Sequence, residues 1–348
     1  MSGTVPHSRP TLGEAEVEAV ARVIRSGQLA QGPETVAFET ELAAAVGRRY
    51  GVAVSSGTTG LQVALLALGV GRGDEVLVPS FVCSALLHAV WAVGAAPVVV
   101  DVEEGTGNLD PGAARGRLGP RVRAVILPHL CGLPARVEEV ESLGLPVIED
   151  CAMAVGTTHR SRPVGSLGIL SVCSFYATKM MATGEGGMVL TDDPGLARAA
   201  RGQREYDGLP ADRPRLNAKT TDLAAALGRV QLARLPGFVA RRRELAARYR
   251  HLLRDLPLSL PPDDAEHAYH RFVVRTSEEV EPLLARLAAL GVAARRPVAR
   301  PLHAELGLAD EAFPRAAAAW RQALSLPIYP SLTEAELEQV AAAVQAAV

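Results

Sequence analysis

Two charged residues of this sequence follow apolar segments, at places where a protein can present a side chain to a ligand. Lys179 closes the run Ser174-Phe175-Tyr176-Ala177-Thr178-Lys179, and a glycine-rich turn follows it at 184–187. Asp150 closes a second apolar segment, which begins at Leu145. A turn of small residues, Ser56-Gly57-Thr58, connects a third apolar segment to a helical pattern. One chain therefore combines an amine, a strand-end carboxylate and a turn that opens a helix.

These three groups predict a binding site for pyridoxal phosphate. The amine of Lys179 would form a Schiff base with the cofactor, and the carboxylate of Asp150 would keep its pyridine nitrogen protonated. The turn at 56–58 would bind the phosphate at a helix N-terminus, where backbone N–H groups have no helical partner. Each group has an ordinary alternative, namely a solvated lysine, an aspartate that caps a turn, and a helix cap made by serine. Their combination favours the cofactor site.

The composition limits the classes of function. The 348 residues carry a formal net charge of −2 and are 48% hydrophobic, which allows a large core and gives no attraction to nucleic acid or to an anionic membrane. The most apolar run, 86–100, is interrupted by His88, Gly94 and Pro97 and is too short to span a bilayer. The N-terminus lacks the charged and apolar regions of a signal peptide. We therefore expect a cytoplasmic protein with no nucleic-acid or membrane partner.

The cysteines give no sign of a metal site. The four of them lie in apolar sequence without CxxC spacing: Cys83, Cys131, Cys151 and Cys173. This pattern favours reduced, buried thiols and predicts neither a zinc site nor a disulfide framework.

Short runs rich in valine, isoleucine and leucine alternate with helical patterns over the first two thirds of the chain. The expected strands are 52–55, 75–79, 97–101, 124–128, 147–150, 171–175 and 187–191. The expected helices between them are 58–68, 84–93, 111–118 and 137–143. Apolar strands joined by crossover helices predict an α/β fold with a mostly parallel, seven-stranded sheet covered on both faces. Ligands bind beyond the carboxyl ends of such strands, where Ser56, Asp150 and Ser174 all fall.

The character of the sequence changes after residue 191. A long helix rich in alanine, arginine and leucine is expected over 235–256, with Pro236 in its first turn. A smaller α+β segment is expected to follow, with strands at 269–275 and 292–295 and with helices at 278–290 and 334–348, the last one capped by Thr333. We therefore expect a large cofactor-binding domain over 1–235 and a small C-terminal domain over 236–348.

Several short motifs follow one another in a fixed order. They are Ser26-Gly27, Gly32, Phe38-Glu39, Ser56-Gly57-Thr58, Gly73-Asp74-Glu75-Val76, Ile148-Glu149-Asp150, Ser174 to Lys179, Gly184-Glu185-Gly186-Gly187, Asn217, Leu324 to Pro330 and Leu332-Thr333-Glu334. Their order and spacing resemble the DegT/DnrJ/EryC1/StrS aminotransferases, a group of fold-type I pyridoxal-phosphate enzymes. Each motif alone is weak, but the series extends over nearly the whole chain.

The resemblance implies a role for each residue of the predicted site. Lys179 and Asp150 would be the catalytic residues, and Lys179 would also move the proton between the substrate carbon and the cofactor. Gly57, Thr58 and Ser174 would bind the cofactor phosphate.

The same resemblance implies partners and substrates. Asn217 matches an asparagine that, in this family, reaches the cofactor phosphate of the neighbouring subunit, which implies a homodimer with shared active sites. The implied reaction is a transamination. An amino acid, glutamate or glutamine, would give its amino group to a keto group on a sugar, a cyclitol or a related small molecule.

Three positions depart from the family pattern. Cys83 stands where the family usually places an aromatic ring over the cofactor, and Phe81 is a candidate to replace that ring. Met153 stands where glutamine or histidine is common, and Pro297-Val298 replaces a His-Tyr pair near the substrate. Because a polar or aromatic contact is lost at each position, these changes predict a substrate other than a standard nucleotide-linked sugar.

Further residues are candidates for contact with the substrate: His129, Tyr176, Arg296, Arg300 and His303. The arginines could bind a carboxylate or a diphosphate. Each candidate has a structural alternative, which is a hydrogen-bonded core histidine or an arginine on a solvated face.

Two other functions are compatible with the sequence. One is a pyridoxal-phosphate enzyme of the same fold that catalyses elimination, replacement or carbon–carbon bond formation on an amino acid. The other is a non-catalytic cofactor-binding protein, which the intact set of Lys179, Asp150 and phosphate-site residues disfavours. A dehydratase of this family would carry histidine in place of Lys179.

Overall fold

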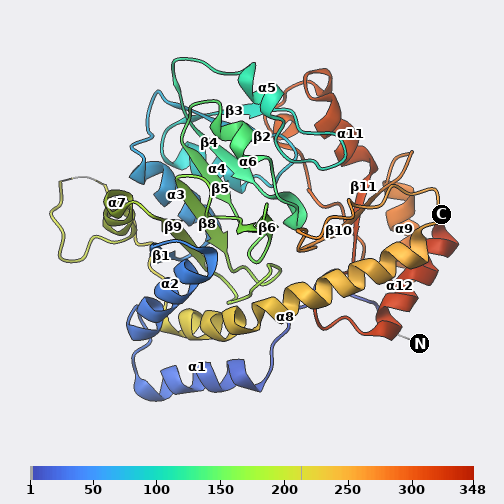
Figure 1. Ribbon diagram of the computed structural model, residues 1–348, viewed down its shortest axis with the longest axis horizontal. Helices are drawn as coiled ribbons and strands as arrows, with labels where there is room; N and C mark the ends of the chain where they lie inside the picture. The colour runs from blue at the N-terminus through green and yellow to red at the C-terminus, as the bar shows by residue number, and fades with distance from the viewer. Residues whose placement is uncertain (1–2, 213) are drawn as a thin grey trace.

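The computed structural model describes residues 3–212 and 214–348. A seven-stranded sheet forms its centre (Figure 1). In spatial order the strands are β1 (Tyr50–Val54), β9 (Gly187–Thr191), β8 (Leu170–Ser174), β5 (Val147–Asp150), β4 (Val122–Pro128), β2 (Glu75–Pro79) and β3 (Ala96–Val100). β9 pairs antiparallel with β1 and β8, and the remaining pairs are parallel. The predicted α/β fold with a mostly parallel sheet is confirmed.

Helices cover both faces of this sheet. One face is packed against α3 (Gly57–Ala67), α4 (Ala85–Ala92) and α7 (Pro194–Arg204), and the other against α2 (Pro33–Val46), α5 (Pro111–Arg115) and α6 (Val137–Glu141). Along β2, Val76 and Val78 enter the core beneath α3 and α4, whereas Leu77 enters the core beneath α5 and α6. This alternation is the two-residue period of a strand buried on both faces, which explains its continuous apolar sequence.

Helix α8 (Asp222–Leu253) is longer than the sequence predicts. The hydroxyl of Thr221 accepts the N–H of Ala224 at 3.2 Å and caps the helix well before the expected start at residue 235. Pro236 lies inside the helix rather than in its first turn, so it removes one helical hydrogen bond. The predicted domain boundary between residues 235 and 236 therefore falls within one continuous helix (Figure 1).

The C-terminal part of the chain builds a second core. Its elements are β10 (Phe272–Arg275), β11 (Ala323–Leu326), α9 (Glu281–Ala289), α12 (Glu334–Ala347) and the second half of α8. β10 and β11 pair antiparallel, and Thr333 caps α12 by accepting the N–H of Glu336 at 3.2 Å, as predicted. The expected strand at 292–295 makes only isolated bridges, because its partners are single residues of distant segments.

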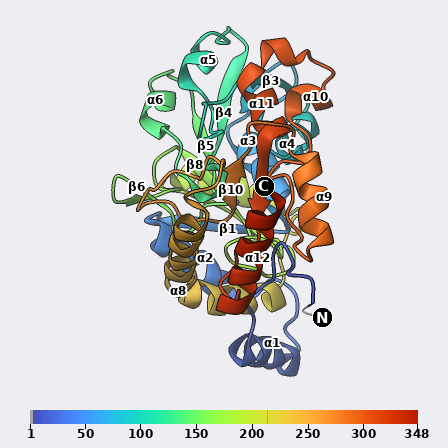
Figure 2. The ribbon, with the colours of Figure 1, turned by 90° about the vertical axis from the view of Figure 1, so that its right-hand side faces the viewer.

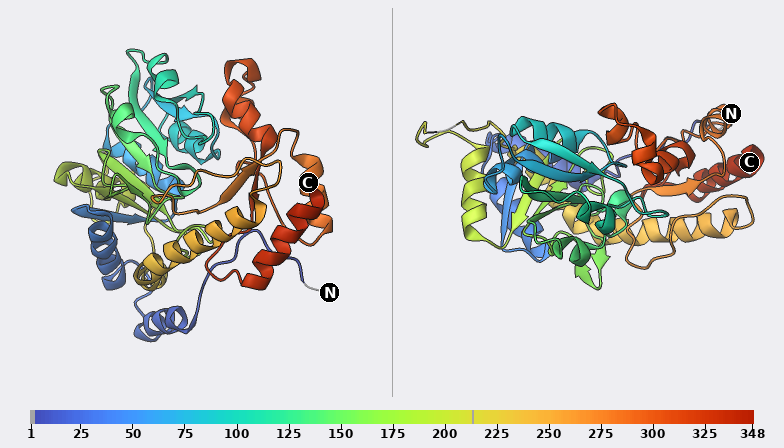
Figure 3. Two further views of the ribbon diagram at one scale, coloured as in Figure 1. Left: turned by 45° about the vertical axis from the view of Figure 1, so that its right-hand side comes forward. Right: turned by 90° about the horizontal axis from the view of Figure 1, so that it is seen from above.

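The N-terminal segment also belongs to this second core. The N–H of Val5 donates to the carbonyl of Gly291 at 2.9 Å, and the carbonyl of Val5 accepts the N–H of Ala293 at 3.0 Å. The first described residues of the chain and helix α12 consequently lie at the same end of the molecule (Figure 2, Figure 3). Core residues of the C-terminal part, such as Val298 and Leu302, meanwhile pack in the core of the large sheet. Each of the two cores therefore includes a segment from the other part of the chain, so the two parts do not meet at one boundary in the sequence.

The remaining elements are short or peripheral. They are α1 (Glu14–Ser26), α10 (Leu302–Glu305), α11 (Pro314–Gln322), the hairpin of β6 (Thr158–His159) and β7 (Arg162–Pro163), and 3-10 turns at Leu130–Gly132 and Asp310–Ala312. Among the described residues, no helix combines the length and the apolar character that a membrane span requires.

Candidate active site

A cavity of about 280 Å³ opens at the carboxyl ends of the central strands. Seven of the predicted site residues line it: Gly57, Thr58, Cys83, Asp150, Ser174, Tyr176 and Lys179. They come from the segments that follow β1, β2, β5 and β8, which are far apart in the sequence. Parallel strands end at one edge of the sheet, and this topology brings the four segments together.

One wall of the cavity is the N-terminus of α3. The hydroxyl of Ser56 accepts the N–H of Thr59 at 3.1 Å and caps the helix. The N–H groups of Gly57 and Thr58 belong to the same first turn and have no acceptor within the helix. A Cβ atom on Gly57 would lie 2.7 Å from Cβ of Ser174, so only glycine allows the serine hydroxyl to lie beside the helix N-terminus. The free N–H donors and the positive end of the helix dipole make this wall suited to bind a phosphate.

Asp150 is the buried acid of the cavity. Its side chain is held by the N–H of Ala152, which donates to Oδ1 at 2.9 Å, and the residue is 6% exposed. Burial raises the pKa of the Asp150 carboxyl, while the charge of Lys179 acts in the opposite direction. A carboxylate with this environment gains from a cationic partner such as a protonated pyridine nitrogen.

The backbone around Lys179 is fixed by the glycine-rich turn. The N–H of Phe175 donates to the carbonyl of Gly186 at 2.9 Å, and the N–H of Ala177 donates to the carbonyl of Gly184 at 3.1 Å. Gly184 has a φ of 89°, a left-handed conformation that favours glycine. The turn therefore returns the chain from β8 to β9 and leaves Lys179 at the cavity.

The structure distinguishes between the two residues proposed to cover the cofactor ring. Cys83 lines the cavity, whereas Phe81 is buried at 2% exposure beside a neighbouring cavity. The strand ends at Pro79, so the two-residue offset no longer keeps both side chains on one face. Met153 packs at the edge of the core beneath α3 and α4. Asn217 is exposed on the segment before α8 and does not line this cavity.

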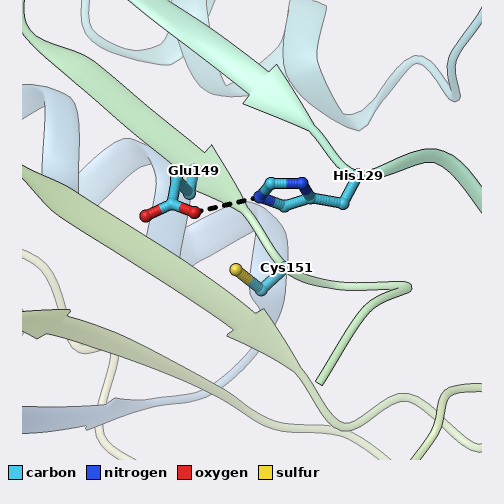
Figure 4. A group of neighbouring side chains, drawn as sticks. All are labelled: His129, Glu149 and Cys151. Atoms are coloured by element: carbon cyan, nitrogen blue, oxygen red, sulfur yellow. Dashed lines mark hydrogen bonds and ion pairs between the residues drawn. The ribbon is translucent and has the colours of Figure 1, made fainter. Parts of the chain in front are cut away.

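The structure places His129 outside the cavity, in a buried network (Figure 4). Its Nε2 bonds to Oε2 of Glu149 at 3.0 Å, and its Nδ1 accepts the N–H of Ala135 at 3.0 Å. Both ring nitrogens are therefore in use and both side chains are 0% exposed. Cys151 lies within 4.8 Å of the ligand atoms of this pair and is equally buried. The expected substrate contact of His129 is replaced by a structural role.

Of the other four substrate candidates, Tyr176 lines the cavity and the remaining three are engaged elsewhere. Both ring nitrogens of His303 are bonded, one to Ser80 at 2.5 Å and one to Asp310 at 3.0 Å. Arg296 forms an ion pair with Glu281, and its guanidinium lies 4.1 Å from the centre of the Trp320 ring. Arg300 has an exposed side chain, 3.8 Å from Glu305. Their sequence motif marked a segment near the site, but burial and local ion pairs decide where each side chain points.

Four residues of the cavity wall were not predicted as site residues: Leu61, Ala85, Ala152 and Glu185. Glu185 could have been found, because it lies in the same glycine-rich turn that positions Lys179. Leu61 and Ala85 carry no chemical signal, and only the packing of α3 and α4 brings them to the wall.

Comparison with known proteins decides the family. The sequence profile of the DegT/DnrJ/EryC1/StrS aminotransferase family matches residues 10–345. The chain belongs to this family. It is 34% identical to the spore coat polysaccharide biosynthesis protein SpsC of Bacillus subtilis, over 98% of this chain and 96% of SpsC.

Solved structures agree with this assignment. DesV of S. venezuelae, solved in complex with a ketimine intermediate, is 37% identical and superimposes with a TM-score of 0.91 over 95% of this chain and 93% of DesV. Spr1654 of Streptococcus pneumoniae, in its PLP form, is 25% identical, with a TM-score of 0.91 over 99% of this chain and 100% of that chain. The predictions of an aminotransferase enzyme and of pyridoxal phosphate as its cofactor are confirmed.

Proposed function

We propose that this DegT-family chain transfers the amino group of an amino acid, glutamate or glutamine, to a keto group of a sugar, a cyclitol or a related small molecule. The observation that carries the proposal is the convergence of Lys179, Asp150 and the N-terminus of α3 on one cavity. The name of SpsC, a polysaccharide biosynthesis protein, supports a carbohydrate acceptor.

The residues of the cavity have separate tasks in this reaction. The N–H groups of Gly57 and Thr58 and the hydroxyl of Ser174 would hold the cofactor phosphate, and the carboxylate of Asp150 would hold the proton on the ring nitrogen. When bound, pyridoxal phosphate supplies the electron sink that stabilises negative charge at the reacting carbon. The amine of Lys179 would move the proton between the substrate carbon and the cofactor.

A homodimer completes the proposal. Asn217 is exposed within one chain and lies outside the cavity, as a residue that serves the neighbouring subunit would. The backbone around it is fixed, because the carbonyl of Ala218 accepts the N–H of Ser55 at 2.8 Å, next to the turn that binds phosphate.

The lysine content of the chain permits a direct test. The sequence contains only two lysines, Lys179 and Lys219. Borohydride reduction of the holoenzyme should attach the cofactor to Lys179 alone, as measured by peptide mass spectrometry. Lys179→Ala should abolish both the label and turnover, whereas the control Lys219→Arg, at the lysine that pairs with Asp207, should keep both. A label on Lys219, or full turnover by Lys179→Ala, would refute the proposal.

The amino donor is tested by spectroscopy. Excess glutamate should bleach the yellow band of the holoenzyme and release 2-oxoglutarate in one equivalent per site. Release of ammonia or of a condensed product without a keto acid would instead support the elimination, replacement or carbon–carbon bond-forming alternative.

A further inference from the structure

A second cavity, of about 300 Å³, lies between the loops of the large sheet and the C-terminal core. The large sheet contributes Phe81, Thr106 and Cys131 to its wall, and the C-terminal part contributes the segment 259–262 and one face of β10. None of the residues assigned above to the binding of the cofactor phosphate lines this cavity.

Strand β10 and the residue just before it contribute two arginines to the wall of the second cavity. Arg271, Val273 and Arg275 all line it, whereas the intervening Phe272 and Val274 are 0% exposed in the C-terminal core. This is the two-residue alternation of a strand, which places every second side chain on the same face. Arg271 and Arg275 are separated by roughly 13 Å along the strand, at about 3.3 Å per residue. Two guanidinium groups therefore belong to the wall of one cavity.

These two half-buried arginines differ in their partners from the buried arginines. Arg48 and Arg204 each lie within 3 Å of a carboxylate oxygen, and Arg242 donates to three backbone carbonyls. In the part of the chain that the structure describes, neither Arg271 nor Arg275 has a carboxylate within ion-pair distance or a side-chain hydrogen bond. Burial lowers the pKa of Arg271 to about 10, and burial also lowers that of Arg275, although the charge of Glu104, which lines the same cavity beyond ion-pair distance, acts in the opposite direction on Arg275. A positive charge that no carboxylate contacts is costly until an anion compensates it.

The second cavity is tied to the segment that carries Lys179. Nε2 of His270 donates to the carbonyl of Thr178 at 3.0 Å, next to both Lys179 and Arg271. The N–H of Arg271 donates to the carbonyl of Cys131 at 3.2 Å. Cys131 and Tyr269 both have left-handed backbone conformations, with φ of 57° and 49°. Such conformations are unfavourable for residues with a side chain and persist only where the surrounding packing holds them. The arginine face is thus held in a fixed position relative to the catalytic amine.

We propose that the second cavity is a subsite for an anionic group, a carboxylate or a phosphate, carried by a substrate of the transamination. This inference rests on the proposed function, because that function is what makes the ligand a substrate. Arg271 binds the inner end of the anion and Arg275 the outer end, and Val273 and Phe81 provide apolar contact between them.

The test uses holoenzyme, in which pyridoxal phosphate already fills its own phosphate site. Succinate and inorganic pyrophosphate are titrated into the wild type, Arg271→Met, Arg275→Met and the control Arg117→Met by isothermal calorimetry. Arg117 is an exposed arginine between α5 and β4. We expect at least one probe to bind, at least 10-fold weaker binding to both cavity variants, and unchanged binding to Arg117→Met. Equal affinity in all four proteins, or no binding of either probe to the wild type, would overturn the proposal.

Two further measurements keep the result interpretable. Arg271→Lys keeps the charge and should keep more affinity than Arg271→Met, whereas a folding defect would show as a lower melting temperature and loss of the cofactor absorption band. Preference for succinate assigns the site to a carboxylate substrate, and preference for pyrophosphate assigns it to a phosphorylated one. The half-reaction is measured separately with glutamate and with glutamine, and it fails with both donors only if the proposed function fails, so the two proposals are refuted by different results.

Discussion

Glu149 and Asp150, the two acids at the end of β5, are adjacent in sequence but differ in how many hydrogen bonds the protein gives to their carboxylates. Glu149 points to the side of the sheet where His129, Gly165, Leu167 and Gly168 all donate hydrogen bonds to its carboxylate. Asp150 points to the cavity and accepts one protein N–H, from Ala152.

This difference appears in the protonation of the two groups. Burial alone would raise the pKa of Glu149, but the hydrogen bonds of His129 and the backbone lower it below its usual value. Burial raises the pKa of Asp150, and only one backbone N–H and the charge of Lys179 act against it. A buried carboxylate whose hydrogen bonds all come from the protein has a structural role. A buried carboxylate that faces a cavity with few protein donors is available to a ligand.

The largest expected effect is on stability. Glu149→Ala should lower the free energy of unfolding by roughly 3–5 kcal/mol, because it leaves the donors of a buried network without an acceptor. Urea unfolding of the apoenzyme measures this change. The turnover of the fraction that remains folded should stay close to that of the wild type, and a specific loss of turnover without destabilisation would contradict the structural role.

Asp150→Asn should give the reverse result. We expect kcat to fall on the order of 10²–10³-fold, as when a preorganised electrostatic partner of the reacting group is removed. The unfolding free energy of the apoenzyme at pH 7 should be at least that of the wild type, since burying the ionised carboxylate is unfavourable. A variant with normal turnover would remove Asp150 from the mechanism, and Glu149→Ala is its matched control.

The smallest expected effect is on the pH dependence of stability. The pKa of Glu149 is lower in the folded state than its ordinary value of 4.5, so ionised Glu149 stabilises the fold above that pH. This contribution is lost as the pH falls through the folded pKa. As the pH is lowered from about 6 to about 3, the free energy of unfolding should therefore fall less steeply for Glu149→Gln than for the wild type. Identical slopes would show that the network does not depend on the charge of Glu149.

Local chemistry in the sequence was sufficient to predict the centre of the site. Lys179, Asp150 and the Ser56-Gly57-Thr58 turn each follow an apolar strand, and parallel strands must end at a common edge. The alternation of strands and helices similarly predicted the seven-stranded sheet, because strands buried on both faces need continuous apolar sequence.

Long-range packing decided the features that the sequence misplaced. The cap of α8 at Thr221 is local, but the continuation of the helix through Pro236 depends on packing, which helix propensity does not describe. The same limit applies to His129 and His303, whose partners Glu149 and Ser80 are distant in sequence.

The sequence by itself determined the fold class, the family and the cofactor chemistry, since these depend on residue types in a fixed order. Only the tertiary structure decided that Cys83 rather than Phe81 lines the candidate active-site cavity, and that the carboxylate of Glu149 is fully hydrogen-bonded by the protein while that of Asp150 faces the cavity. It also placed Arg271 and Arg275 on the wall of one cavity without a carboxylate partner among the described residues. The physical reason is that a side chain's partners come from whichever segments fold against it, and residue order does not encode those distances locally.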